Sequence, residues 1–434
     1  MANSAASLWA RSAWIDGAWR NDVLMSIDGE GRWTSIAPGV STAPPRAKIL
    51  DGPVLPGVVN AHSHAFQRAF AGQAEYSATD DDDFWSWRDR MYAIANRITP
   101  NELTTTATAL YREMLRGGYT HVCEFHYLQH APDGSRYDDR LAMIRALVAA
   151  ASATGIGLTV LPVLYERAGF RDDRLRDDQR RFMTSVEDVV ALRDGVRALG
   201  APHVEAGVAI HSLRAARPAS IERLIDACAH DTGPIHIHVA EQLREVDDCI
   251  AATGRRPIEW LTENLSLDAR WQLVHATHAL PHEIDDVAQS GAGVVLCPTT
   301  EANLGDGLPD LPHWLHSGAR LAIGSDSQVT RDWREELRLL EYGQRLAHRR
   351  RNVAATSQQS SAARLFDVML EGSAAAAGLE RWGFVVGSRA DLLMVDPDDE
   401  ALRDVPAARR LDAVVFVSPS RPFQQVMVAG RWVI

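Results

Sequence analysis

Imidazole and carboxylate side chains occur at three widely separated points of this chain, each directly after a stretch of apolar residues. They belong to the segments His62-Ser63-His64, His238-Val239-Ala240-Glu241 and Gly324-Ser325-Asp326. These are the ligand types that zinc and similar divalent ions take in proteins, and a catalytic site of this kind leaves one position open for water. Because each segment follows an expected strand, the pattern predicts a catalytic metal site at the carboxyl ends of parallel strands.

His62 and His64 are separated by one residue, so on a strand both imidazoles point to the same side and can reach one ion. His238 ends the fifth expected strand, and Asp326 follows the eighth. Each of them alone could be a hydrogen-bonded core residue, but their recurrence at strand ends favours a metal site. We therefore expect the metal ligands to be His62, His64, His238 and Asp326.

Glu241 and His275 are expected to complete the site. Glu241 lies three residues after His238, and a carboxylate there can relay a proton to a leaving nitrogen, although it could instead be a surface residue that begins a helix. His275 ends the sixth expected strand. His236 shares a face with His238 but lies farther from the strand end. On the same ground His275 is preferred to His278.

The chain contains a single lysine, Lys48, which precedes the first expected barrel strand. Two-metal hydrolases on such a barrel commonly bridge their ions with a carboxylated lysine, and this barrel has no lysine to modify. Glu124 could serve as a bridging carboxylate, so a two-metal site remains an alternative. The sequence favours one divalent ion per chain, with Zn²⁺ as the expected metal.

The elements that must position these residues are short, almost continuously apolar segments that alternate with amphipathic helical stretches. Helical stretches are expected at 101–116, 137–154 and 219–230. The alternation favours a parallel (β/α)₈ barrel of the TIM type, an α/β fold, over an open sheet. The eight expected strands are 54–59, 120–125, 157–164, 204–210, 234–238, 271–275, 292–297 and 320–324.

Both chain ends have the pattern of short strands and tight turns. Residues 14–19 predict a hairpin with an Asp16-Gly17 turn, and residues 28–33 predict a second one. Further strands are expected at 390–396, 413–417 and 426–434. We expect residues 1–53 and 383–434 to form one small β-sandwich domain beside a catalytic barrel of residues 54–382.

The overall composition is that of a globular protein, with 46% hydrophobic and 24% charged residues. A net charge of −12 argues against nucleic acid as a partner, although it permits a local cationic pocket. The four cysteines form no CxxC pair, which fits a reducing compartment. No signal-peptide pattern and no membrane-length apolar run occurs, so we expect a cytoplasmic protein. The aspartates at 80–83 and the arginines at 349–351 are expected to be solvated helix ends.

With these residues placed, the chain resembles the amidohydrolase superfamily, in its metal-dependent deaminase branch. The branch's motif set is matched by His62-x-His64, His238-x-x-Glu241, His275 and Asp326. From about residue 54 to 352, more specific motifs resemble the deiminases that act on N-formimino-L-glutamate in histidine degradation. These motifs are the segments 60–68, 84–88, 124–127, 211–214, 236–242, 297–307 and 340–345.

The resemblance implies hydrolysis of a linear amidine, in which N-formimino-L-glutamate and water give N-formyl-L-glutamate and ammonia. It implies that Asp326 accepts the proton of an activated water and that Glu241 carries a proton to the departing nitrogen. His275 would orient the attack and stabilise the charged intermediate. The implied reaction agrees with the chemistry that these residue types can perform at a metal ion.

The resemblance also implies a small-molecule substrate with two carboxylates and a homodimeric assembly. Guanidinium groups bind carboxylates in a bidentate manner, so each of two arginines can hold one. Gln129 and Gln328 stand where the family usually has histidine, which puts fine loop contacts in doubt. The residues that match the family's substrate-contacting positions are Gln67, Arg88, Tyr127, His211 and Arg214.

Two other functions are compatible with parts of the pattern. A deaminase of a cyclic base, such as a purine or an S-adenosyl compound, would share the metal ligands but would be expected to use aromatic and amide groups in place of two arginines. A catalytically inactive barrel that serves as a binding module would be expected to have lost ligands. Every metal position is filled here, which favours an enzyme.

Overall fold

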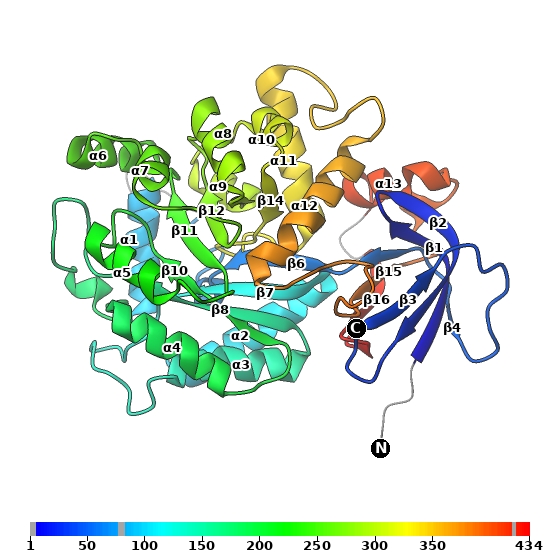
Figure 1. The fold of residues 1–434 in the computed structure, drawn as a ribbon, viewed down its shortest axis with the longest axis horizontal. Coiled ribbons are helices and arrows are strands. Elements are labelled where there is room, and N and C mark those ends of the chain that lie inside the picture. The colour runs from blue at the N-terminus through cyan, green and yellow to red at the C-terminus, as the bar shows by residue number, and fades with distance from the viewer. Residues whose placement is uncertain (1–5, 77–82, 419–421) are drawn as a thin grey trace.

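The computed structural model describes residues 6–76, 83–418 and 422–434, which form a parallel β-barrel and a separate β-sheet beside it (Figure 1). Adjacent barrel strands pair in parallel, and β9 (Val204–Ala206) pairs with the N-terminal half of β8. This confirms the predicted α/β barrel. In order around the barrel, the strands are β6 (Val58–Ser63), β7 (Tyr119–His126), β8 (Gly157–Leu164), β10 (Val208–Ile210), β11 (Ile235–Val239), β12 (Trp271–His275), β13 (Gly293–Leu296) and β14 (Arg320–Ile323).

The barrel closes where the chain leaving β14 meets β6. Ser63 and Asp326 form an isolated parallel bridge. The His64 N–H donates to the Asp326 carbonyl at 3.2 Å, and the Asp326 N–H donates to the His62 carbonyl at 3.0 Å. Close approach here requires glycine at position 324, because a Cβ atom there would lie 2.6 Å from His62 Cβ. Closure therefore brings two histidines and one aspartate of the expected site into contact.

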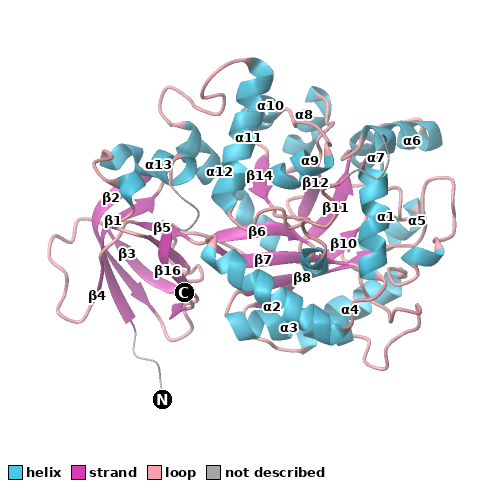
Figure 2. Cartoon of the chain, turned by 180° about the vertical axis from the view of Figure 1, so that it is seen from behind, coloured by secondary structure: helices cyan, strands magenta, loops and turns pink. Residues whose placement is uncertain are grey.

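Helices cover the outside of the barrel, and most of them connect one strand to the next (Figure 2). Their apolar faces and the barrel strands share one continuous core. The helices are α1 (Phe84–Ala95), α2 (Pro100–Arg116), α3 (Ala142–Thr154), α4 (Val186–Ala198), α5 (Pro218–Ala227), α6 (Leu243–Thr253), α7 (Pro257–Asn264), α8 (Pro281–Ser290), α9 (Pro298–Leu304), α10 (Leu311–Ser317), α11 (Trp333–His348), α12 (Ser361–Ala377) and α13 (Arg410–Phe416).

The separate sheet combines strands from both chain ends, so blue and red strands lie side by side in Figure 1. Its hairpin of β1 and β2 turns at Asp16 and Gly17, both with positive φ, as predicted. The sheet encloses its own apolar cluster, which includes Trp33, Leu392 and Met427. Its strands are β1 (Ala6–Ile15), β2 (Ala18–Ile27), β3 (Trp33–Ala37), β4 (Lys48–Leu50), β5 (Val54–Pro56), β15 (Leu392–Val395), β16 (Phe423–Val428) and β17 (Arg431–Trp432).

The prediction of one barrel strand over 54–59 is wrong in its extent. β5 pairs with β1 and β15 in the separate sheet, and the barrel strand begins only at Val58. Gly57 lies between the two strands, where a Cβ atom would be 2.3 Å from Thr120 Oγ1. The apolar run is continuous in sequence, so its division between two sheets is set by tertiary packing.

The prediction of a strand over 413–417 is also wrong, because α13 covers most of this segment. A short apolar run fits either a strand or a buried helix, and here neighbouring groups decide. α13 packs against α11 and α12. Arg334 and Arg338 of α11 donate to its Val414 and Val415 carbonyls, which would otherwise have no partner at the helix end.

Two runs of like charge were predicted to be solvated helix ends. Asp83 is the N-cap of α1 and accepts from the Trp85 and Ser86 N–H groups, while the aspartates at 80–82 lie outside the described residues. The arginines at 349–351 are exposed just beyond α11, as predicted. Among the described residues, no helix is both long and apolar enough to cross a membrane.

The seam of the barrel leads to a stability prediction. Gly324→Ala should lower the free energy of unfolding by about 1–3 kcal/mol, because the new methyl group overlaps the His62 backbone and Cβ. Thermal unfolding of both proteins measures this. Gly169→Ala is the control, since the nearest atom to its new Cβ would be 3.9 Å away. Equal unfolding midpoints for Gly324→Ala and the native protein would contradict the tight seam.

Candidate functional site

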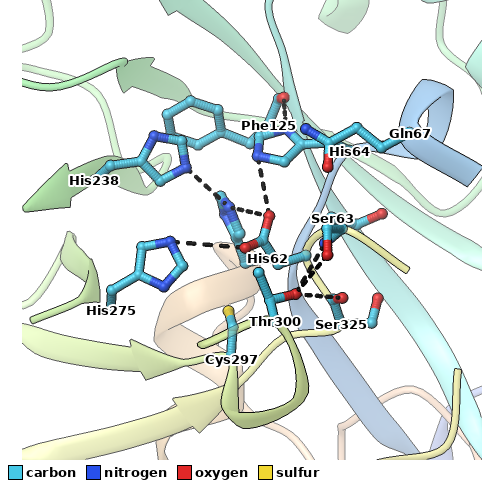
Figure 3. Close-up of polar contacts among 12 residues, drawn as sticks. His62, Ser63, His64, Gln67, Phe125, His238, His275, Cys297, Thr300 and Ser325 are labelled. Carbon is cyan, nitrogen blue, oxygen red and sulfur yellow. Dashed lines mark hydrogen bonds and ion pairs between the residues drawn. The ribbon is translucent and has the colours of Figure 1, made fainter. Parts of the chain in front are cut away.

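The four expected metal ligands converge at the carboxyl end of the barrel. Figure 3 shows the three histidines among them, His62, His64 and His238. His62 lies near the end of β6, His64 follows that strand, and His238 lies on β11. The Asp326 Oδ1 atom is 3.5 Å from His62 Nε2 and 3.3 Å from His64 Nε2. The Nε2 atoms of His238 and His62 are 3.0 Å apart. Four potential ligand atoms from three strand ends therefore face one point.

The chemistry of this donor set fits a divalent metal ion. Burial lowers the pKa of His62 to about 3 and lowers the pKa of His64 and of His238, so all three imidazoles are neutral and offer lone pairs. His64 Nδ1 lies 2.8 Å from the Phe125 carbonyl, which fixes the proton on Nδ1 and leaves Nε2 free. Burial alone would raise the pKa of Asp326, but its hydrogen bond with His62 and the nearby imidazoles lower that pKa.

Three residues at the site have an unfavourable backbone conformation. Ala240, His275 and Asp326 have φ values of 51°, 68° and 44°, in the left-handed region that residues other than glycine rarely adopt. Each lies at the point where a strand becomes a loop. Such conformations persist only where the surrounding structure holds them, and they cluster at functional sites.

Glu241 and His275 lie beside the metal-binding cluster. His275 Nε2 is 3.6 Å from Glu241 Oε1 and 3.7 Å from Asp326 Oδ2. Burial raises the pKa of Glu241 to about 7. Burial alone would lower the pKa of His275, but Glu241, Glu301 and Asp326 together raise it to about 10. The pair can therefore hold and transfer a proton next to the cluster.

Two buried glutamates that support these groups were not predicted as site residues. Glu301 Oε1 lies 3.3 Å from His275 Nδ1 and accepts from the Cys297 N–H, so it orients the imidazole. Glu245 accepts from the N–H groups of Ala240 and Glu241 with its two oxygens. Glu301 belongs to the motif at 297–307, whereas Glu245 gives no signal beyond its position four residues after Glu241.

The five residues that match substrate-contacting positions line one cavity, together with His64, His238, Glu241, His275 and Asp326. Gln67 donates to the Tyr127 hydroxyl at 3.2 Å, and its buried Oε1 has no partner among the described residues. The five residues are Gln67, Arg88, Tyr127, His211 and Arg214. All five were expected from the resemblance to contact the substrate, and the cavity brings them together.

The two arginines of this cavity lack strong carboxylate partners. Arg214 is only 9% exposed and forms no hydrogen bond or ion pair with any residue in the described ranges. The nearest ion-pair contact of Arg88 is 3.8 Å, to the exposed Asp89, which also pairs with Arg176. Arg88 Nε is buried without a partner in the described part of the chain. The charge of Arg214 acts on the buried carboxyl groups of Glu241 and Glu245 and partly offsets the rise in their pKa that burial causes, but neither carboxyl forms a hydrogen bond with it. The N–H groups of the two arginines therefore suit an anionic ligand.

Three other candidates point away from the metal-binding cluster. His236 Nε2 lies 2.9 Å from the Ala376 carbonyl of α12. Glu124 accepts from the Ser63 hydroxyl and the Ala65 N–H with its two oxygens, and it belongs to none of the potential metal-binding groups among the described residues. Lys48 lies on β4 of the separate sheet.

Gln129 and Gln328, which depart from the family pattern, both make local contacts. Gln129 donates to the His126 carbonyl at 2.9 Å. Gln328 donates to the Ser63 hydroxyl and to the Asp326 carbonyl, at 2.9 and 2.7 Å, and so links the two segments that carry metal-binding residues. Both side chains therefore act on loop geometry and not on the cavity.

The comparisons with known proteins agree with this site. A model of the amidohydrolase family matches residues 54–433, and the chain belongs to this family of metal-dependent hydrolases. Formimidoylglutamate deiminase of Pseudomonas aeruginosa is 45% identical over 430 residues, which are 99% of this chain and 94% of that protein. 8-Oxoguanine deaminase of the same species is 25% identical over 408 residues, 91% of this chain and 85% of that protein.

Solved structures show the same architecture. An amidohydrolase from Brucella melitensis superimposes with a TM-score of 0.93 at 40% identity, covering 98% of this chain and 94% of that chain. An adenosine deaminase from Xanthomonas campestris with bound zinc has a TM-score of 0.80 at 24% identity, covering 98% and 92%. The second likeness concerns the fold alone.

The role of Glu245 can be tested through stability. Glu245→Ala should lower the free energy of unfolding by about 1–3 kcal/mol, because two buried N–H groups lose their acceptor. Denaturant unfolding measures the change. The control is Glu263→Ala, which removes an exposed ion pair with Arg255 and should cost less than about 0.5 kcal/mol. Equal effects of the two substitutions would contradict the role given to Glu245.

Proposed function

We propose that this protein hydrolyses N-formimino-L-glutamate to N-formyl-L-glutamate and ammonia, a step of histidine degradation. The observation that carries the proposal is one cavity lined both by metal-binding residues and by two arginines that form no hydrogen bond with a carboxylate among the described residues. The relative at 45% identity, which bears the name of this activity, supports it. The substrate has a reactive amidine and two carboxylates, so its groups match the acidic and the basic residues that line the cavity.

The proposed metal ligands are His62, His64, His238 and Asp326, which would hold one Zn²⁺ ion. A divalent ion held by these residues would supply Lewis acidity and would lower the pKa of a bound water molecule. A single ion is supported by the absence of lysine from the barrel and by the commitment of both Glu124 oxygens to other groups.

The proposed catalytic residues are Asp326, Glu241 and His275. Asp326 Oδ1 faces the imidazoles while Oδ2 is the atom near His275, so Oδ2 can accept the proton of the attacking water. Glu241, with its pKa raised to about 7 by burial, transfers a proton to the departing terminal nitrogen. His275 donates towards the reacting centre and balances the charge of the intermediate.

The charges of the cavity complement a substrate of this kind. An amidine is a strong base that is cationic at neutral pH, and it would lie beside Glu241 and Asp326. Arg88 and Arg214 would each hold one carboxylate, and Gln67, Tyr127 and His211 would make the remaining contacts. Because the protein carries a net charge of −12, selection of a dianion depends on such local positive groups.

A deaminase of a cyclic base is not favoured. Two arginines without strong partners suit carboxylates better than a neutral ring, and the relatives named for purine compounds are only about one-quarter identical, such as the 25% identical 5-methylthioadenosine/S-adenosylhomocysteine deaminase of Haloquadratum walsbyi. A homodimer and a cytoplasmic location remain predictions. The division of the chain into a barrel of residues 54–382 and a domain built from the two chain ends also remains a prediction.

An ammonia-release assay with a panel of compounds tests the proposal. The metal-loaded protein should release ammonia fastest from formimino-glutamate, more slowly from formimino-aspartate, and not measurably from guanine or adenosine. Formimino-aspartate is the informative comparison, since it shortens the distance between the carboxylates by one methylene. Preferred turnover of guanine or adenosine would replace the proposal with the cyclic-base alternative.

The metal content follows from the four ligands. Elemental analysis of fully loaded, desalted protein should give about one equivalent of a divalent ion per chain. Two tightly held equivalents would contradict the single-ion site and would bring Glu124 forward as a bridging group.

The proton transfer can be isolated with Glu241→Gln, which keeps the shape and removes the titratable group. Turnover should fall by at least about 10²-fold, the usual scale for general acid–base catalysis. Metal content should be retained. Near-normal turnover would mean that Glu241 is only a structural residue at the start of α6.

Substrate selection can be tested with Arg88→Met and Arg214→Met. Each should lower kcat/KM by about 30- to 700-fold, which corresponds to about 2–4 kcal/mol, because a bound carboxylate loses its charge-assisted partner. Formimino-glycine lacks the γ-carboxylate, so the native protein should act on it poorly. Activity on formimino-glycine should fall little further in the variant that lacks the arginine for the γ-carboxylate. Arg223→Met, which breaks an exposed pair with Glu187, is the control. Full activity of both cavity variants would contradict the dicarboxylate assignment.

A further inference from the structure

Three guanidinium groups from separate parts of the chain pack on one tryptophan ring. The Cζ atoms of Arg88, Arg214 and Arg244 lie 4.6, 5.1 and 4.8 Å from the ring centroid of Trp85. Arg88 and Trp85 belong to α1, Arg214 follows β10, and Arg244 belongs to α6. All three distances are within the range of a cation–π interaction.

Trp85 does not line the cavity, although its helix neighbours Phe84, Trp87 and Arg88 do. The indole is half-buried and meets the cavity through the side chains of Arg88 and Arg214, which it contacts. This separates it from the residues already given a role in binding or catalysis.

The Trp85 ring can stabilise two neighbouring arginines without occupying their hydrogen-bond donors. Arg88 and Arg214 lie in the same cavity, and neither forms a hydrogen bond with a carboxylate among the described residues, although Glu241 and Glu245 interact with the charge of Arg214. A carboxylate hydrogen-bonded to either arginine would compete with the substrate for the N–H groups. An aromatic face attracts a guanidinium without accepting its N–H hydrogen bonds, so those donors remain free for a carboxylate.

We propose, building on the function proposed above, that Trp85 is a positioning residue that holds Arg88 and Arg214 in place for a dicarboxylate ligand. Arg244, the third arginine on the ring, extends the cationic surface from the cavity to solvent. Its side chain is 68% exposed, and its only ion-pair contact among the described residues is a 3.9 Å approach to Asp248. Arg244 thus attracts anionic ligands to the entrance of a protein whose overall charge repels them.

The experiment uses full-length, metal-loaded protein and measures binding of glutarate by isothermal titration calorimetry. Glutarate has two carboxylates at the spacing found in glutamate but no reactive group, so binding is read without turnover. Trp85→Leu should weaken glutarate binding by about tenfold or more, and Trp85→Phe, which keeps a smaller aromatic face, by no more than about threefold. Unchanged glutarate affinity in Trp85→Leu would overturn the proposal.

Kinetics of Trp85→Phe provide a second test that does not depend on whether Trp85→Leu folds. The KM for formimino-glutamate should rise by about two- to threefold with kcat unchanged, because the arginines are displaced while the metal-binding cluster is intact. An unchanged KM, or a fall in kcat alone, would overturn the positioning role.

Arg244 is tested by its salt dependence. Arg244→Gln should lower kcat/KM by about two- to fivefold at low ionic strength, and the difference should vanish in about 0.5 M salt because exposed charges are screened. The matched control is Arg255→Gln, which removes the same charge from an exposed position where Arg255 pairs with Glu263. Equal effects of the two substitutions would overturn the role of Arg244.

The two proposals can fail separately. If the native protein neither binds glutarate nor releases ammonia from formimino-glutamate, the proposed function is wrong. If the native protein does both while the Trp85 variants behave like the native protein, only the positioning role is wrong.

Discussion

The parallel bridge between Ser63 and Asp326 is the contact on which the rest of the site depends. It joins the last strand of the barrel to the first, and its two backbone hydrogen bonds involve the backbones of His62, His64 and Asp326. Barrel closure and assembly of the metal-binding cluster are therefore one structural event. The Gln328 side chain reinforces the bridge by donating to both of its sides.

The bridge also explains why the cluster is so deeply buried. His62 is fully buried, and burial keeps its imidazole neutral, with a pKa of about 3. Neutral imidazoles beside an ionised aspartate form a preorganised binding site, because no proton has to leave before a divalent ion enters. The strained backbone at His275 and Asp326 is held by the same closed barrel, which orients these side chains before any ligand is bound.

The cavity is lined by groups of opposite charge. Glu241 and Asp326 are carboxyl groups in its lining, whereas Arg88 and Arg214 are cations that form no hydrogen bond with a carboxylate among the described residues. The proposed substrate complements both kinds of group, because its amidine is cationic and its two carboxylates are anionic. A neutral ring complements neither.

The sequence predicted the barrel and the convergence of the four proposed metal ligands because their signals are local, whereas the substrate-contacting residues came from the resemblance. A histidine or aspartate directly after an apolar strand reveals its place at a strand end, and the hairpin at Asp16 and Gly17 is specified by its own two residues. The exceptions depend on neighbours distant in sequence. The division of the 54–59 run at Gly57 depends on packing against Thr120, and the helix over 413–417 depends on the α11 arginines.

The roles of Glu245 and Trp85 could not be predicted from the sequence for the same reason. Glu245 is one acidic residue among many in a helix, and only the folded chain shows that its oxygens hold two backbone N–H groups. Trp85 lies within a motif that was noted for the resemblance, but its contacts with Arg214 and Arg244 join segments more than one hundred residues apart.

The most direct test of the central claim is identification of the products formed from N-formimino-L-glutamate by NMR. With the arginines at the glutamate end of the substrate and Glu241 at the terminal nitrogen, the terminal nitrogen should leave. The predicted products are N-formyl-L-glutamate and ammonium in equal amounts. Formation of L-glutamate and formamide would contradict the account, because the bond to the glutamate nitrogen would then be the one that breaks.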